Sequence, residues 1–157
     1  MTVSSGEAFG ADAILTDLPA RNLHQVMDGA LDALAEARAI PPGGIAVLRK
    51  ALRVREAAGA TAVGNGVAMP HARVAAIRRL VLAVIRVKSP GLPAAPDGMP
   101  VRIVFCFLSP LNAGGHDHLV LLQRIARASQ DPLWVKGALE AVGPAGFAHH
   151  LKTGGRR

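Results

Sequence analysis

Histidines at two places in the chain supply the side chain best suited to chemistry near neutral pH. The first is His71, which follows a Gly-Asn-Gly turn at 64–66, the apolar residues 67–69 and Pro70. Glycine and asparagine allow the left-handed backbone of a tight turn, and proline holds the residue before it extended. The sequence therefore predicts a histidine delivered at the end of a rigid extended segment. The alternative is an ordinary surface histidine in a loop.

The second place is the run His116-Asp117-His118, which opens a predicted helix. Free N–H groups and the helix dipole favour an anion at a helix N-terminus, and a histidine there can donate a hydrogen bond to phosphate. These residues can equally be ordinary polar groups at a helix start. Histidines two apart can also share a metal ion, but no further cluster of Cys, His or Asp follows at a zinc spacing. We therefore expect no metal site.

Two further residues could take part in chemistry. Arg55 stands beside Glu56 at the predicted end of a helix, shortly before the glycine turn. Its guanidinium can supply a charged fork for a phosphoryl group, or the pair can simply be solvated. Cys106 lies inside an apolar run, so we expect a small core residue rather than a nucleophile. A single cysteine also excludes an intramolecular disulfide and fits a reducing compartment.

Alternating strand-like and helical segments must position these residues. Nearly continuous apolar residues at 80–87 and 101–108 predict strands buried on both faces, joined by a loop at 89–100, and 13–18 predicts a shorter strand. Helices are predicted from residue 21 to before Pro41, over 45–58, after Pro110, and from Pro132 to before Gly143, with a short amphipathic segment at 147–151. The pattern indicates an α/β fold, a three-layer α/β/α sandwich with a central mixed β-sheet flanked by helices.

Length and composition limit the function further. At 157 residues the chain fits one domain over 13–151, with a flexible lead at 1–12 and a basic tail at 152–157. It has no run of about eighteen apolar residues and no secretory signal, so we expect a cytoplasmic protein without membrane insertion. The net charge is +7, but the arginines are scattered and aromatic residues are scarce. We therefore expect no nucleic-acid partner.

Four short strings occur in the order and spacing of a known family. They are Arg55-Glu56 followed by Thr61, Gly64-Asn65-Gly66-Val67-Ala68-Met69-Pro70-His71, Asp97-Gly98-Met99-Pro100-Val101 before a strand, and Asp117-His118-Leu119 opening a helix. From about residue 15 to 151 the chain resembles the type-2 enzyme IIA domain of the bacterial phosphotransferase system (PTS), in its fructose/mannitol and nitrogen-regulatory branches. The fold of that family, a mixed sheet between helices, agrees with the pattern above.

The resemblance implies a phosphocarrier. His71 would take a phosphoryl group from the carrier HPr, or a nitrogen-branch paralogue, and pass it to a cysteine of an enzyme IIB partner. His118 matches the second active-site histidine and Arg55 the family's arginine, and no cofactor, metal or nucleotide is required. The alternative is a regulatory binding module, in which phosphorylation of His71 controls affinity for a target protein. One departure is Ala72, where the family commonly has glycine after the histidine.

Overall fold

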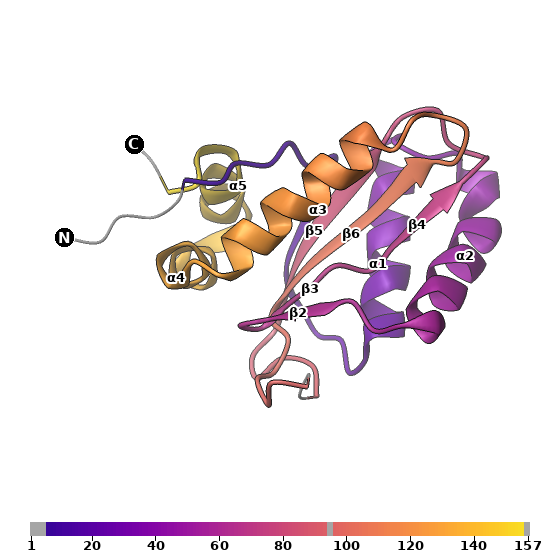
Figure 1. Cartoon of the computed structure of the whole chain (residues 1–157). Coiled ribbons are helices and arrows are strands. Elements are labelled where there is room, and N and C mark those ends of the chain that lie inside the picture. The colour runs from indigo at the N-terminus through magenta and orange to yellow at the C-terminus, as the bar shows by residue number, and fades with distance from the viewer. Residues whose placement is uncertain (1–5, 94–95, 156–157) are drawn as a thin grey trace.

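Six strands form one mixed sheet in the computed structural model, which describes residues 6–93 and 96–155 (Figure 1). The strands are β1 (Ala13–Leu18), β2 (Ala62–Gly64), β3 (Val67–Ala68), β4 (His71–Val74), β5 (Val81–Val87) and β6 (Ile103–Pro110). Their order is β1-β5-β6-β3-β2, and β4 also pairs with β6, further along than β3. β5 and β6 are antiparallel, whereas β1 runs parallel to β5, and β3 and β4 run parallel to β6. The predicted mixed sheet is confirmed.

β5 and β6 form the centre of the sheet because their residues are apolar on both faces. Side chains alternate between the faces, and every residue from 81 to 87 and from 103 to 109 is buried. Arg86 is the charged exception, and its guanidinium donates to the carbonyls of Ala138 and Ala141 at 3.0 and 2.7 Å. The strands predicted at 80–87 and 101–108 are confirmed to within two residues. The loop predicted at 89–100 lies partly outside the described residues.

Five α-helices cover the sheet within the described residues. They are α1 (Leu23–Glu36), α2 (Ile45–Ala58), α3 (His116–Ser129), α4 (Pro132–Glu140) and α5 (Gly143–Thr153), with a 3-10 turn, Pro42–Gly44, before α2. Asn22 caps α1 by accepting a hydrogen bond from the Gln25 N–H at 2.9 Å, and Asp131 caps α4 in the same way. The short segment predicted at 147–151 is wrong in extent. Gly143 and Pro144 begin α5, because proline fits the first turn of a helix.

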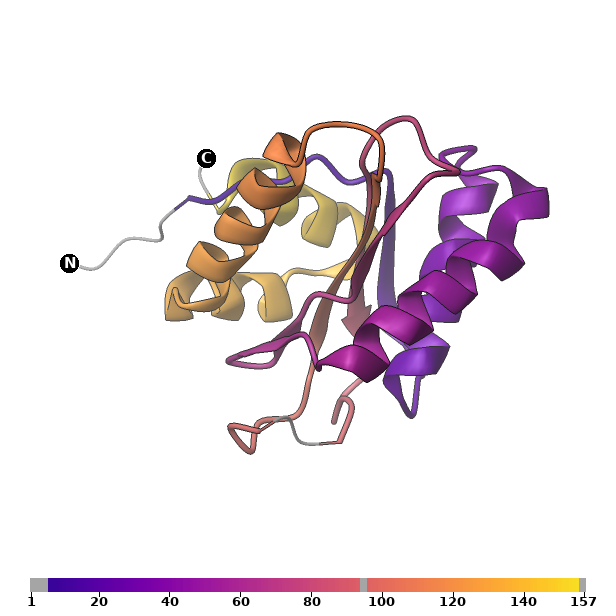
Figure 2. The ribbon, with the colours of Figure 1, turned by 45° about the vertical axis from the view of Figure 1, so that its right-hand side comes forward.

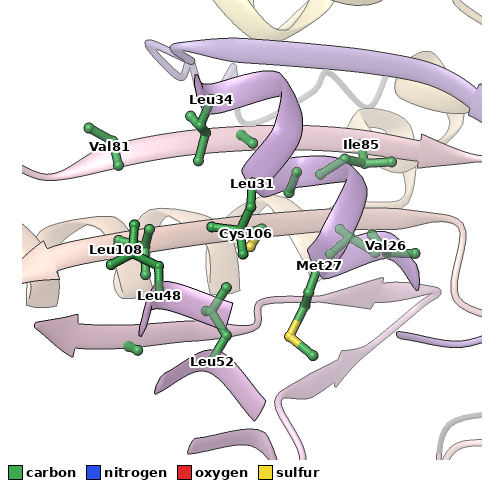
Figure 3. Packing of buried hydrophobic residues seen from close by; sticks show 14 of the residues in the cluster. Val26, Met27, Leu31, Leu34, Leu48, Leu52, Val81, Ile85, Cys106 and Leu108 are labelled. Atoms are coloured by element: carbon green, nitrogen blue, oxygen red, sulfur yellow. The ribbon is translucent and has the colours of Figure 1, made fainter. Parts of the chain in front are cut away.

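The helices make two layers, one on each face of the sheet (Figure 2). α1 and α2 cover one face, where Leu31 packs with Ile85 and Cys106 (Figure 3). α3, α4 and α5 cover the other face, where Phe105 and Trp134 are fully buried. Each strand of the central pair supplies apolar side chains to both cores. The predicted three-layer α/β/α sandwich is therefore confirmed.

The described parts of the predicted lead and tail lie against the domain. Phe9 is buried against Phe105, and its N–H donates to the Leu151 carbonyl at 2.7 Å. Lys152 and Thr153 belong to α5, while residues 1–5 and 156–157 lie outside the described residues. Within the described part of the chain, each helix is too short or too polar to cross a membrane.

Candidate functional site

His71 is the first residue of β4, a strand of 4 residues at the edge of the sheet. The sequence predicted a histidine at the end of an extended segment, and the extended chain in fact continues through it as a strand. His71 lies opposite Phe107 on β6, and Arg73 lies opposite Ser109. Residues opposite one another on neighbouring strands point to the same face. These four side chains therefore share the face of the sheet that α3 covers.

The Gly-Asn-Gly turn places the chain that leads into β4. Asn65 has φ of 55° and Gly66 has φ of 78°, so both adopt the left-handed backbone that the sequence suggested. A Cβ on Gly66 would also lie 3.0 Å from the Pro100 carbonyl oxygen. The Asn65 N–H donates to Asp97 Oδ2 at 3.0 Å, and its side-chain amide donates to the Ser129 carbonyl at 2.7 Å. The turn is thus tied both to the loop before β6 and to the end of α3.

The imidazole of His71 is buried but keeps one nitrogen available. Its ring stacks on Phe107, with the centroids 4.8 Å apart and the planes within 8°. Its Nδ1 lies 2.7 Å from the Met69 carbonyl oxygen. Because a carbonyl only accepts hydrogen bonds, Nδ1 carries the hydrogen and Nε2 carries the lone pair. The residue is 7% exposed, yet Nε2 has no hydrogen-bond partner among the described residues and is not fully sealed from solvent.

His118, in the first turn of α3, meets His71 edge-on, with the ring centroids 5.1 Å apart and the planes at 68°. Its Nδ1 lies 2.6 Å from the hydroxyl oxygen of Ser109, which is buried at the end of β6. Each of the two histidines is therefore anchored through Nδ1. Among the described residues, each keeps Nε2 for a ligand.

Burial and neighbouring charges lower the pKa of both histidines. For His71 desolvation is the largest cause, opposed by the hydrogen bond to Met69 and reinforced by the positive charge of Arg55. For His118 desolvation again leads, followed by the charges of His71, Arg73 and Arg55. With both pKa values below the ordinary value near 6.5, both imidazoles are mainly neutral at pH 7. The site is a pair of neutral imidazoles in positive surroundings, which suits an incoming anion.

Arg55 lies in the opposite helix layer and acts on this site through its charge. It lies in the last turn of α2, which packs beside the edge strand β4, and its guanidinium donates to the Gly59 carbonyl at 3.0 Å. The neighbouring Glu56 accepts hydrogen bonds from both the N–H and the hydroxyl of Thr61. Glu56 therefore fixes the start of the β2 segment, while Arg55 is held within electrostatic range of the histidines.

Two other candidates from the sequence lie apart from the cluster. His116 is exposed at the start of α3, and the rings that pack together at the site are those of His71, His118 and Phe107. Cys106 is fully buried on the opposite face, and burial, with a smaller contribution from Glu56, raises the pKa of its thiol to about 12. The prediction that Cys106 is a core residue is confirmed. The described residues contain no group of three side chains placed to hold a metal ion.

Phe107 and Ser109 line the site but were not singled out in the sequence. Both belong to the buried strand β6, where Phe107 reads as an ordinary core residue. The available signal was Ser109, a polar residue at the carboxyl end of an otherwise apolar run. Its role depends on the register between β4 and β6, which the sequence does not specify.

Comparison with known proteins places this site in a family. The sequence profile described as "Phosphoenolpyruvate-dependent sugar phosphotransferase system, EIIA 2" matches residues 7–153. A nitrogen regulatory protein of Pseudomonas aeruginosa is 35% identical over 121 residues, which cover 73% of this chain and 77% of that protein. One from Bradyrhizobium diazoefficiens is 43% identical over 77 residues, 49% of this chain, and there the chain spans only half of the relative's length.

Comparison with a solved structure shows that the fold is also shared with this family. The nitrogen regulatory protein IIA-Ntr from Neisseria meningitidis superposes with a TM-score of 0.72 at 29% identity, covering 85% of this chain and 88% of that one. The matched profile includes both histidines and almost all of the described chain. The chain belongs to the type-2 EIIA family of the phosphoenolpyruvate-dependent sugar phosphotransferase system.

Proposed function

We propose that this protein is a phosphohistidine phosphocarrier that accepts a phosphoryl group on His71 Nε2. The donor is HPr or a nitrogen-branch paralogue, and the acceptor is a cysteine of an enzyme IIB partner. The observation that carries the proposal is the 2.7 Å contact between His71 Nδ1 and the Met69 carbonyl, which leaves the lone pair on Nε2, an atom without a hydrogen-bond partner among the described residues. A neutral imidazole with a lowered pKa is the nucleophilic form of this side chain.

The transfer balances without a metal or nucleotide. The Nε2 lone pair forms a bond to phosphorus, and the P–N bond of a donor phosphohistidine protonated on its second nitrogen breaks. The donor ring keeps the bonding electron pair and leaves as neutral imidazole. Phosphorylated His71 then carries positive charge on its ring, which the Met69 carbonyl stabilises through Nδ1–H. In the second step an acceptor thiolate attacks phosphorus, and His71 recovers its lone pair.

His118 and Arg55 would support the phosphoryl group rather than bond to it. If the Ser109 hydroxyl donates to His118 Nδ1, the hydrogen of that imidazole is on Nε2 and can be donated to a phosphoryl oxygen. The charge of Arg55 acts on both histidines and would stabilise the oxygens as the group moves. Phosphoryl transfer depends mainly on such positioning and charge stabilisation.

Labelled phosphoenolpyruvate tests the acceptor atom. The protein is incubated with enzyme I, the carrier and the label, and His71→Ala is compared with His116→Ala, an exposed histidine that serves as the matched control. We expect acid-labile, alkali-stable label on the wild type and on the control, and none on His71→Ala. Label on the His71→Ala variant would contradict the assignment of His71 as the phosphoryl acceptor. His118→Ala should still be labelled, but about 10- to 100-fold more slowly, because it loses one stabilising donor.

A regulatory role is the second candidate. It is favoured by the names of the Pseudomonas and Neisseria proteins described above, which are nitrogen regulatory proteins. In that case phosphorylation of His71 changes affinity for a target protein and no sugar is transported. Transfer of label to an enzyme IIB from the same genome would favour sugar uptake. Pull-down of a target by only one phosphorylation state, without onward transfer, would favour regulation.

A further inference from the structure

The hydroxyl of Ser109 joins the end of the central strand β6 to the first turn of α3. Ser109 is 2% exposed, and its hydroxyl oxygen lies 2.6 Å from Nδ1 of His118. α3 begins at Gly115 without a side-chain cap, so this contact ties the first turn of the helix to the sheet. Phe107, two residues earlier in β6, points to the same face and stacks on His71. One strand therefore sets the positions of both imidazoles.

The direction of the hydrogen bond between Ser109 and His118 follows from the partners that each group has. A neutral imidazole carries one N–H, and a hydroxyl group can either donate or accept. If Nδ1 of His118 donated, the hydrogen of the Ser109 hydroxyl would need another acceptor, and the described residues offer it none. A buried donor without an acceptor costs free energy. Donation by Ser109 satisfies both groups and places the hydrogen of His118 on Nε2.

The charges beside Ser109 favour the same direction. A cavity of about 130 Å³ adjoins Ser109 and His118. The charged groups on its walls are three guanidiniums and one carboxylate, those of Arg73, Arg78, Arg79 and Asp117. Guanidinium groups only donate hydrogen bonds, so these walls offer few acceptors to a hydroxyl hydrogen. Positive charge on this side also stabilises a lone pair on Nδ1 better than an N–H.

We propose that Ser109 is a positioning residue that fixes His118 as a hydrogen-bond donor toward the phosphoryl group. This rests on the proposed function, in which that group is carried by His71. The two imidazoles then present complementary nitrogens, because His71 Nε2 offers a lone pair to phosphorus and His118 Nε2 offers a hydrogen to a phosphoryl oxygen. A donor that is oriented in advance stabilises the charge on the oxygens without reorganising during the transfer.

Two substitutions and a control separate this role from a general effect on packing. Ser109→Ala removes the hydroxyl, whereas Ser109→Thr keeps it and has the adjoining cavity for its extra methyl group. Ser129→Ala is the matched control. Ser129 is the other buried serine among the described residues, and its hydroxyl donates to the Ala126 carbonyl at 2.9 Å. It ends α3, about 16 Å along the helix from His118.

NMR of ¹⁵N-labelled protein reads the tautomer of His118 without any phosphoryl transfer. Correlations from the ring hydrogens distinguish a protonated nitrogen from one that carries a lone pair, and His118→Ala identifies the resonances. Above pH 7, where His118 is mainly neutral, we expect a protonated Nε2 in the wild type and in Ser109→Thr. In Ser109→Ala both nitrogens should move toward the average of the two tautomers. A wild-type His118 with its hydrogen on Nδ1 would overturn the proposal.

The kinetic test measures phosphoryl transfer to His71 from a phosphorylated HPr-like carrier of the same genome. Ser109→Ala should lower the limiting rate about tenfold and leave the half-saturating concentration of the carrier within about twofold, because Ser109 is buried and acts only within the site. Ser109→Thr should recover most of this loss, and Ser129→Ala should match the wild type. An equal loss in Ser129→Ala would assign the effect to packing and overturn the proposal.

A double substitution tests whether Ser109 acts through His118. If it does, Ser109→Ala combined with His118→Ala should transfer no more slowly than His118→Ala alone. Additive losses, or a wild-type rate in Ser109→Ala, would overturn the proposal and leave the phosphocarrier function standing. Absence of label on wild-type His71 would instead refute that function, and with it any role of Ser109 in transfer, whatever tautomer the NMR experiment finds.

Discussion

Two buried histidines in this molecule look alike locally and differ in what surrounds them. His71 and His150 are each 7% exposed and each hold a backbone carbonyl through one ring nitrogen, at 2.7 Å from Met69 and 2.9 Å from Trp134. Each also packs against an aromatic ring, with centroids about 5 Å apart. Burial is the largest cause of the lowered pKa in both cases.

The difference lies on the other side of each ring. A second imidazole lies edge-on to the His71 ring, and the charge of Arg55 acts on it. His150 has only His149 as a charged neighbour that affects its pKa, and its ring lies against the backbone of α4. A Cβ on Gly137 would stand 2.5 Å from His150 Cε1. Burial and a lowered pKa therefore do not by themselves identify a histidine as part of a functional site. The second imidazole and the charge of Arg55 are what distinguish His71.

The sharpest way to break this comparison is to remove each histidine in turn. We expect His71→Ala to abolish phosphoryl acceptance, a loss of several orders of magnitude. His150→Ala should leave the initial rate within about twofold but lower the free energy of unfolding by about 3 kcal/mol, because it removes a buried ring and its hydrogen bond. Denaturant unfolding and phosphoryl labelling are measured on both variants. A folded His150→Ala protein that takes no label would refute the separation of roles.

Acidification tests the property that His71 and His150 share, a pKa lowered by burial. Unfolded histidine titrates near pH 6.5, and the folded pKa values of His71, His118 and His150 lie below this. The unfolded state therefore binds more protons below about pH 6.5, so the free energy of unfolding falls as the pH drops through this region. Unfolding curves from pH 7.5 to 5 should show this fall. His150→Gln should make it shallower, and an unchanged slope would show that burial of His150 does not oppose its protonation.

Substitution of Ala72 has the smallest expected effect and tests how the backbone next to His71 influences the site. It is buried in β4 directly after His71, on the face toward α1 and α2. Ala72→Gly should cost about 1 kcal/mol of unfolding free energy through lost burial and added chain freedom, and leave labelling of His71 unchanged. Chemical denaturation and the labelling rate are the two measurements. A faster rate would mean that alanine after His71 restricts the transfer.

Most of the fold could be predicted because its signals are local. The apolar runs of β5 and β6, the cap Asn22 and the Asp131-Pro132 start of α4 are each determined by neighbouring residues. The extent of α5 was missed because Gly143-Pro144 can either end one helix or begin the next. At this junction the same two residues are compatible with both interpretations, so the local sequence does not decide between them.

The candidate site could be predicted in part. The string that ends at His71 was recognisable, and its resemblance to a family named His118 and Arg55 as its companions. Ser109 and Phe107 could not be found in this way, because their contacts with the histidines depend on the pairing of β4 with β6. Such pairing between distant segments is set by tertiary packing and not by the residues of either strand alone.

The buried Arg86 makes the C-terminal helices inseparable from the sheet. Its guanidinium ties β5 to the end of α4 through two carbonyls and lies 5.2 Å from the centre of the Phe147 ring of α5. A chain truncated after α3 would remove both carbonyls and the Phe147 ring and leave Arg86 only its 3.7 Å ion pair with Asp17. It would also expose the apolar face of the sheet that α4 and α5 cover, at a cost of several kcal/mol. Limited proteolysis should therefore not yield a stable core that lacks α4 and α5. The smallest unit able to present His71 in its native setting extends to the last helix.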